Sequence, residues 1–215
     1  KNKPIEITET GLDMEMIHKI ISNTYGLVLV SGPTSSGKST TLSSIIDYIS
    51  KKYSYHILTI EDPVEYIYEG KNSYISQREI GSEVDTYKQA IIDALRSNPN
   101  VILVGEIRDK ETAEEVMKAR QTGHLVLSTI HADCVINTIE RFVNLFPENE
   151  RHTRKISLSN TLKAIINQRL IKTNQNKIEL LYEHIYGTTP VLRKIRDDGR
   201  KLIQLRTIMD IEKIK

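Results

Sequence analysis

The stretch Leu27-Val28-Leu29-Val30-Ser31-Gly32-Pro33-Thr34-Ser35-Ser36-Gly37-Lys38-Ser39 decides the fold of this chain. It opens with a short apolar run and closes on eight residues that fit the pattern G-x-x-x-x-G-K-[ST]. An unbroken apolar run predicts a strand that is buried on both faces of a parallel sheet. We expect a loop after the run and then a helix over about residues 37–51. The sequence therefore predicts a strand, a tight loop and a helix in succession.

The loop between this strand and helix has the composition of a phosphate-binding loop. Gly32 and Gly37 let the backbone turn back, so that successive N–H groups point inward at phosphate oxygens. The amino end of the following helix adds positive potential. Lys38 would place an ammonium group on the β and γ phosphates, and the Ser39 hydroxyl would ligate Mg²⁺. The residues predicted to bind nucleotide are Gly32, Pro33, Thr34, Ser35, Ser36, Gly37, Lys38, Ser39 and Thr40. A glycine-rich turn without a ligand is the weaker alternative, because strand and helix flank the loop.

Further apolar runs alternate with amphipathic stretches along the chain. The runs Ile57–Ile60, Val101–Val104 and Leu125–Ile130 are predicted to be buried strands. Helices are predicted over residues 13–24, 85–97, 111–122 and 149–170. A strand over 178–185 and short basic helices over 190–196 and 201–211 are predicted near the end. This alternation predicts a doubly wound α/β domain, with a mainly parallel sheet flanked by helices and a helical carboxy-terminal tail.

Composition limits the class of protein. The chain has 215 residues, of which 39% are hydrophobic, and this suits one globular domain with a small appendage. Its net charge of +2 argues for neither nucleic acid nor a lipid surface as partner. One cysteine, Cys134, excludes an internal disulfide and fits a reducing cytoplasm; we interpret it as a small buried apolar residue. No run of about 18 apolar residues is present, so no membrane span is predicted.

Acidic residues follow two of the predicted strands. Glu106 comes after Val101–Val104 and Gly105, and Glu61, Asp62 and Glu65 come after Ile57–Ile60. The carboxyl ends of parallel strands are where ligands bind in open α/β sheets. Glu106 is therefore the candidate acid on the metal side of the site. For the other three, an acidic surface loop is an equally good interpretation.

Two histidines, His124 and His131, bracket the predicted strand Leu125–Ile130. A single histidine at a strand end is usually a surface or capping residue. Two histidines around a strand that ends near a nucleotide are more suggestive of function. The residues alone leave both interpretations open.

Four segments together resemble the motifs of one superfamily. Thr59–Tyr66 (TIEDPVEY) resembles the "Asp box" of the secretion ATPases, which serve type II secretion, type IV pili and type IV secretion. Ile102–Asp109 (ILVGEIRD) resembles their atypical Walker B segment, and Thr122–His131 (TGHLVLSTIH) resembles their "His box". Gln77–Gly81 (QREIG) matches a further segment of the family. With a single cysteine the chain has no tetracysteine zinc insert, which places it nearest the pilus-retraction ATPases and their type IV secretion relatives.

The resemblance implies a RecA-like P-loop ATPase that forms a homo-hexameric ring of bilobed subunits. Its partners would be platform proteins of the inner membrane, and the chain would lie on the cytoplasmic side, peripheral to that membrane. The chain lacks an initiator methionine and opens in a polar run without an apolar signal core, so we expect an upstream domain. We divide it into a linker from that domain (1–12), a RecA-like ATPase domain (13–172) and an appendage of the same domain (173–215).

The resemblance also assigns roles to residues. Lys38 and Ser39 would bind phosphate and metal, and Glu106 would complete the Mg²⁺ site through water. Glu65 would orient or deprotonate the attacking water, and His131 would sense the γ-phosphate. Supporting residues would be Glu61, Asp62, His124 and Arg108.

This chain departs from the family in two respects. Ser35 stands where these proteins usually carry glycine, so the loop must accept a side chain there. The family's PAS-like domain, which contributes arginines to a neighbouring site, is not in this sequence, and such arginines can be worth about 10³-fold in rate. Candidates for local roles are Arg78, Arg108, Arg120 and Arg169.

Three functions are compatible with these residues. The first is an Mg²⁺-dependent ATPase motor for a secretion or pilus machine. The second is a nucleotide-gated assembly module with slow turnover, and the third is a RecA-like motor on DNA. Glu65 and Glu106 favour the first over the second. We do not expect a nucleic acid partner, because the sequence shows no basic stripe interleaved with aromatic residues.

Overall fold

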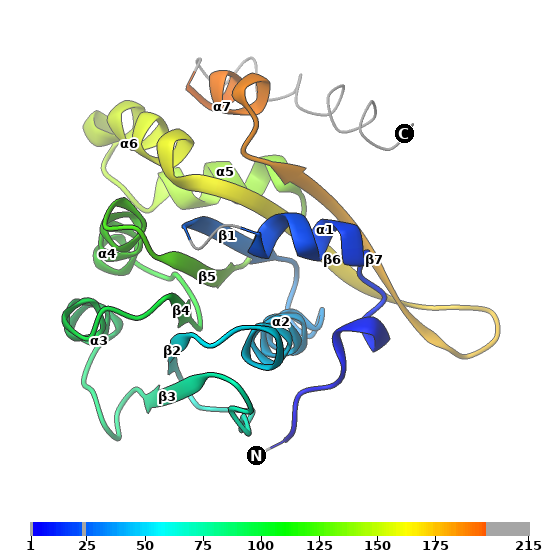
Figure 1. Ribbon diagram of the computed structural model, residues 1–215. Coiled ribbons are helices and arrows are strands. Elements are labelled where there is room, and N and C mark those ends of the chain that lie inside the picture. Colours follow the sequence, from blue (N-terminus) through cyan, green and yellow to red (C-terminus); the bar gives the residue numbers. More distant parts are fainter. Residues whose placement is uncertain (1, 23–24, 197–215) are drawn as a thin grey trace.

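A seven-stranded sheet in the order β3-β2-β4-β5-β1-β6-β7 forms the centre of the molecule (Figure 1). The computed structural model describes residues 2–22 and 25–196. The strands are β1 (Gly26–Ser31), β2 (His56–Glu61), β3 (Tyr74–Glu79), β4 (Val101–Val104), β5 (Leu125–Ile130), β6 (Leu162–Lys172) and β7 (Ile178–Tyr186). All neighbours pair in parallel except β7, which runs antiparallel to β6. The predicted α/β fold with a mainly parallel sheet is confirmed.

Helices cover both faces of this sheet. They are the 3-10 helix η1 (Ile7–Glu9), α1 (Met14–Ile21), α2 (Lys38–Lys52), α3 (Tyr87–Arg96), α4 (Lys110–Gln121), α5 (Val135–Asn144), α6 (Glu148–Thr161) and α7 (Thr189–Arg196). Successive residues of β1 point to opposite faces, as the pleat of a strand requires. Leu27 and Leu29 pack into the core formed with α3, α4, α5 and α6, while Val28 and Val30 pack into the core formed with α1 and α2. β1 is thus buried on both sides.

The prediction of one helix over residues 149–170 is wrong in its second half. Helix α6 ends at Thr161, and Leu162 begins the longest strand of the sheet, β6. Apolar residues at helical spacing in this segment also form a continuous apolar run, which a strand buried on both faces produces equally well. Pairing with β1 decides between them, because it places Ile165 in one core and Ile166 in the other.

β3 and α5 were also absent from the sequence prediction. β3 is an edge strand with polar residues and only partial burial, so it lacks the apolar run that marks the other strands. Helix α5 begins after Cys134, whose sulfur accepts a hydrogen bond from the Asn137 backbone N–H. Cys134 is half-buried and caps a helix, and is not the fully buried residue that we expected.

The ends of the described chain pack on the sheet. Ile7 and Leu12 are buried in the core that also holds α1 and α2. The predicted strand over 178–185 is confirmed as β7, and the predicted helix over 190–196 as α7. The predicted helix over 201–211 lies outside the described residues. Within the part of the chain that the structure describes, no helix has the length and apolar character needed to cross a membrane.

Candidate nucleotide-binding site

A cavity of about 560 Å³ lies where β1, β2, β4 and β5 end. Segments 34–40, 61–66 and 105–108 line it, together with His131 and the side chain of Leu170. These segments follow four different strands and meet because parallel strands deliver their carboxyl ends to one edge of the sheet. The cavity therefore contains Glu61, Asp62, Glu65, Glu106, Arg108 and His131, which are among the residues singled out from the sequence.

The backbone of the loop after β1 has the conformation that its glycines permit. Gly32 has φ +152°, and a Cβ at this position would lie 2.3 Å from the Gln168 carbonyl oxygen, so no other residue fits. Gly37 has φ +84° and precedes α2 directly. Ser35 also has a positive φ, +61°, which a side chain disfavours by about 1–2 kcal/mol. This explains why glycine is usual at that position in the family that the sequence resembles.

Lys38, the first residue of α2, is folded over the loop. Its Nζ donates hydrogen bonds to the carbonyl oxygens of Gly32 (3.1 Å) and Pro33 (2.8 Å). Burial lowers the pKa of Lys38, and the charge of Glu106 partly offsets this effect. The buried ammonium thus has two neutral acceptors, and an anionic phosphate would be a stronger partner. In the same loop the buried Ser36 hydroxyl has no hydrogen-bond partner among the described residues. Both features fit a loop that receives phosphate oxygens.

Glu106 is the centre of a charged cluster opposite the loop. Its Oε1 lies 3.2 Å from Nε2 of His131, and its Oε2 accepts a hydrogen bond of 2.8 Å from Nε of Arg108. Nη1 of Arg108 lies 4.0 Å from a carboxylate oxygen of Asp62. The Glu106 side chain is only 16% exposed. Its contacts with His131 and Arg108 hold it facing the cavity. The exposed Ser39 hydroxyl lines the same cavity.

The two other acids after β2 differ in environment. Glu61 is buried and accepts hydrogen bonds from Thr59 Oγ1 (2.7 Å) and Gln77 Nε2 (3.4 Å). Burial raises the pKa of Glu61, against the opposing effect of these donors. Glu65 is exposed to the cavity. Glu65 is therefore free to meet a ligand, whereas Glu61 is bound into the protein.

The sites implied for ATP and Mg²⁺ can be compared with these residues. The loop supplies backbone amides and Lys38 for phosphates, and Ser39 and Glu106 supply oxygens for a hard cation. Residues 2–22 and 25–196 contain no cluster of three or more His, Cys, Asp or Glu suited to a metal ion. Mg²⁺ usually takes one or two protein ligands together with waters and substrate phosphates.

His124 lies away from this cavity. It precedes β5 and so lies at the opposite edge of the sheet from His131, which follows β5. Its Nδ1 lies 2.9 Å from both Thr122 Oγ1 and the Ala119 carbonyl oxygen, at the end of α4. Among the four arginines considered, only Arg108 lines the cavity.

Gln168 is a residue of the site that the sequence did not indicate. Its Nε2 donates to the Ser36 carbonyl oxygen (2.7 Å), and its Oε1 accepts from Thr41 Oγ1 (2.9 Å). Gln168 thereby links both α2 and the loop between β1 and α2 to β6. No signal marked it, because the segment was predicted to be helical. Tyr66 was also missed, and its hydroxyl lies 2.9 Å from Thr40 Oγ1.

Comparisons with known proteins agree with this geometry. A family model described as "Type II/IV secretion system protein" matches residues 3–207. The chain is 40% identical over 197 residues to the "Type IV pilus retractation ATPase PilT" of Pseudomonas aeruginosa, covering 92% of this chain and 57% of that protein. It is 40% identical over 194 residues to a "Twitching motility protein" of Neisseria gonorrhoeae, covering 90% of this chain and 52% of that protein. The chain thus spans about half the length of these curated relatives.

Solved structures show the same fold. The pilus retraction motor PilT with bound ADP superposes with a TM-score of 0.91 at 42% identity, covering 98% of this chain and 61% of that one. The ATPase DotB of Legionella pneumophila superposes with a TM-score of 0.90 at 30% identity, covering 98% and 59%. The predicted RecA-like P-loop fold is confirmed by these likenesses.

Proposed function

The chain belongs to the type II/IV secretion system protein family, and from this membership we propose that it is the motor domain of an ATPase that powers a secretion or type IV pilus machine. The observation that carries the proposal is the cavity in which Lys38 faces Glu106, with His131 and Arg108 on that carboxylate. Relatives of this family include an ADP-bound pilus retraction motor, which supports nucleotide as the ligand.

We assign roles by position in the cavity. Lys38 would exchange its two loop carbonyls for phosphate oxygens. Ser39 and Glu106 would hold Mg²⁺, Glu106 through water; when bound, this ion neutralises charge on the phosphates. Glu65, exposed to the cavity, would orient or deprotonate the attacking water. His131, held by Glu106, would contact the γ-phosphate.

Assembly and location belong to the same proposal. We infer a homo-hexamer on the cytoplasmic side of the inner membrane, with platform proteins of that membrane as partners. Support comes from relatives whose names place them in pilus and type II secretion systems.

Binding of Mg-ATP tests the proposal directly. Isothermal calorimetry is expected to give a heat of association, and Lys38→Ala is expected to weaken it about 10- to 100-fold, since hydrogen bonds to charged groups are worth about 1.5–3 kcal/mol. Lys52→Ala, at the exposed far end of the same helix, is the matched control. Phosphate release then separates the motor from a nucleotide-gated assembly module, which would bind without turnover. Absence of binding would contradict both.

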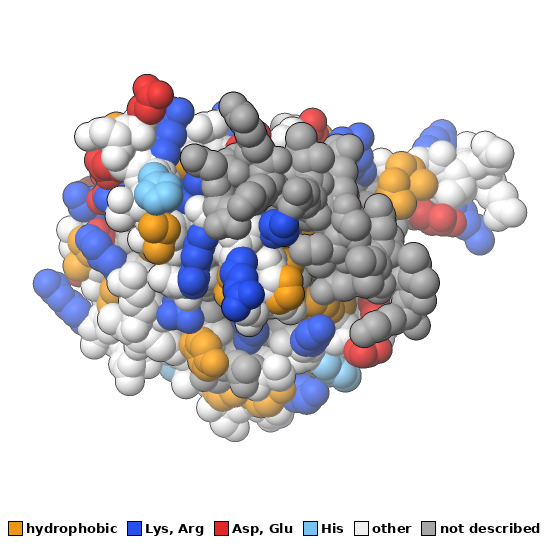
Figure 2. Space-filling view, turned by 90° about the horizontal axis from the view of Figure 1, so that it is seen from above, with side chains coloured by type: hydrophobic (Ala, Val, Ile, Leu, Met, Phe, Trp, Pro, Cys, Tyr) orange, Lys and Arg blue, Asp and Glu red, His pale blue; other side chains and the backbone are white. Residues whose placement is uncertain are grey.

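A DNA motor is the remaining alternative. Figure 2 shows Lys and Arg side chains on the face seen from above, and α7 carries Arg193, Lys194 and Arg196 in its last turn. The whole chain has a net charge of only +2, so an attraction for phosphate backbones would depend on this face alone. Salt-sensitive DNA binding with DNA-stimulated hydrolysis would favour this alternative.

A further inference from the structure

The loop that follows His131 is held at three of its backbone groups by side chains of the β6–β7 hairpin. Nδ2 of Asn167 donates to the Ala132 carbonyl oxygen at 3.0 Å. Nη2 of Arg169 donates to the Asp133 carbonyl oxygen at 2.9 Å. A carboxylate oxygen of Glu183 accepts from the Val135 backbone N–H at 2.6 Å. Hydrogen bonds thus hold the backbone of residues 132–135 to the β6–β7 hairpin.

The three side chains share a face of the hairpin. Asn167 of β6 lies directly opposite Glu183 of β7, and Arg169 is two residues further along β6. Because alternate residues of a strand point the same way, all three face the loop before α5. Figure 1 shows β6 and β7 running beside α5 and then extending beyond the rest of the sheet.

Asn167 also contacts the end of β1, directly before the loop that leads to α2. Its Nδ2 lies 2.9 Å from Oγ of Ser31, the last residue of β1, and Thr138 of α5 donates to the same oxygen at 2.7 Å. The Asn167 side chain is 4% exposed. One buried amide therefore connects the loop after His131 to β1, which ends at Ser31.

We propose that Asn167, Arg169 and Glu183 are positioning residues, which set the distance between His131 and the phosphate loop through the backbone of residues 132–135. The inference rests on the proposed function, since it takes His131 to contact the γ-phosphate. His131 is 42% exposed and has one fixed contact of its own, with Glu106, so its reach into the cavity depends on where the loop lies.

Substitution of Glu183 tests the proposal with a built-in rescue and a matched control. Glu183→Ala removes the acceptor for Val135 N–H, while Glu183→Gln keeps an oxygen that can accept it. Glu179→Ala removes a carboxylate from the same face of the same strand, exposed and pairing with Ile171. In the natural full-length protein we expect Glu183→Ala to lower kcat about 3- to 10-fold, the factor that one net hydrogen bond is worth. Glu183→Gln and Glu179→Ala should stay near the wild-type value.

Ligand discrimination separates positioning from general loss of structure. Glu183→Ala should weaken binding of a non-hydrolysable ATP analogue and leave ADP binding unchanged, because only the analogue carries a γ-phosphate. In a His131→Ala background, Glu183→Ala should add no further loss. Equal weakening of ADP and analogue, or full additivity with His131→Ala, would overturn the proposal. If the wild-type protein binds Mg-ATP without hydrolysing it, the motor function fails, while the analogue-to-ADP comparison still decides on positioning.

Discussion

Glu106 contacts two basic side chains of the cavity, His131 and Arg108, and its charge is the property to test first. Glu106→Gln keeps the size and removes the charge that pairs with His131 and Arg108. In the natural full-length protein we expect kcat to fall about 10²-fold or more, since electrostatic and proton-transfer groups contribute factors of this size. Binding of ATP should be retained, because the loop and Lys38 are untouched. Phosphate release and calorimetry measure the two quantities, with Glu111→Gln on the exposed side of α4 as control. Unchanged turnover would remove Glu106 from the mechanism.

The ionisation of Glu61 makes the free energy of unfolding depend on pH. Burial raises its pKa above 4.5, so the folded state binds this proton more tightly than the unfolded state. The stabilisation is present below about pH 4.5 and is lost as the pH rises through the raised pKa. Glu61→Gln removes the ionisation and keeps an acceptor for Thr59 Oγ1. We therefore expect Tm to be higher than wild type at pH 8 and equal to it near pH 4, with the exposed Glu83→Gln as control. A lower Tm at pH 8 would contradict this account.

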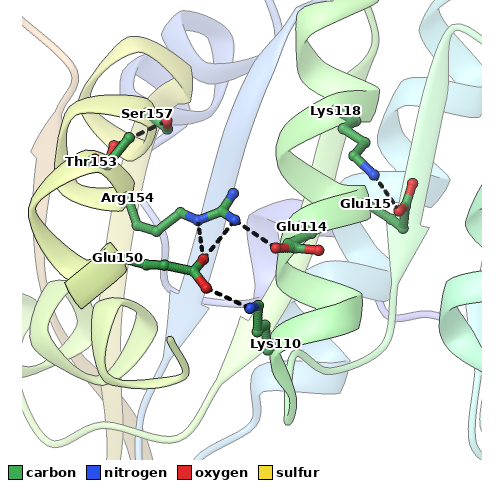
Figure 3. Close-up of polar contacts among 8 residues, drawn as sticks. All are labelled: Lys110, Glu114, Glu115, Lys118, Glu150, Thr153, Arg154 and Ser157. Carbon is green, nitrogen blue, oxygen red and sulfur yellow. Dashed lines mark hydrogen bonds and ion pairs between the residues drawn. The ribbon is translucent and has the colours of Figure 1, made fainter. Parts of the chain in front are cut away.

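At the scale of elements, charged side chains join α4 to α6 (Figure 3). Arg154 Nη2 contacts Glu114 at 2.6 Å and Glu150 at 2.8 Å, and Lys110 Nζ contacts Glu150 at 2.7 Å. The Arg154 guanidinium also lies 4.7 Å from the ring centre of Phe146. Lys110 opens α4 directly after the Glu106–Asp109 segment. The network thus ties the helix that follows the acidic cluster to its neighbour.

Arg154→Met tests this network, because it keeps apolar packing and removes the charge. We expect Tm to fall by about 2–4 °C at low salt, because surface ion pairs contribute only modestly to the stability of a chain of this size. Hydrogen bonds from Lys110 and Arg154 lower the pKa of Glu150, so the stabilisation is present above pH 4.5 and is lost as the pH falls through the lowered pKa. The difference from wild type should shrink in acid and in high salt. Lys118→Met, whose partner Glu115 lies in the same helix, is the control. An equal loss in both variants would mean that the link between the helices adds nothing.

At the scale of the molecule, the cavity is short of positive charge. Lys38 and Arg108 are the Lys and Arg side chains among its described lining residues, and Arg108 is paired with Glu106. Charge on the transferred phosphoryl group therefore calls for cations from outside the residues of this chain. We expect the natural full-length protein to form hexamers with ATP, and kcat per chain to rise with assembly. Light scattering and phosphate release over a range of protein concentrations measure both. A monomer with concentration-independent turnover would contradict the ring.

The local sequence was sufficient for the features that depend on neighbours in the chain. Leu27–Ser39 alone predicted strand, loop and helix, because consecutive burial, two glycines and a lysine have local physical causes. Glu106 and His131 could be predicted for the same edge of the sheet, since strand ends in a parallel sheet must meet. The family resemblance, not the local sequence, singled out Ser35, and its positive φ supplies the reason.

Only the tertiary structure decided where distant side chains and ambiguous segments go. The apolar pattern of Leu162–Lys172 is compatible with a helix or a strand, and pairing with β1 makes it a strand. Gln168, Asn167 and Glu183 acquired their partners through that pairing, so no local pattern marked them. His124 was separated from His131 because a strand places its two ends at opposite edges of a sheet. Sequence periodicity reports which residues are apolar, and long-range hydrogen bonds between strands determine which element buries them.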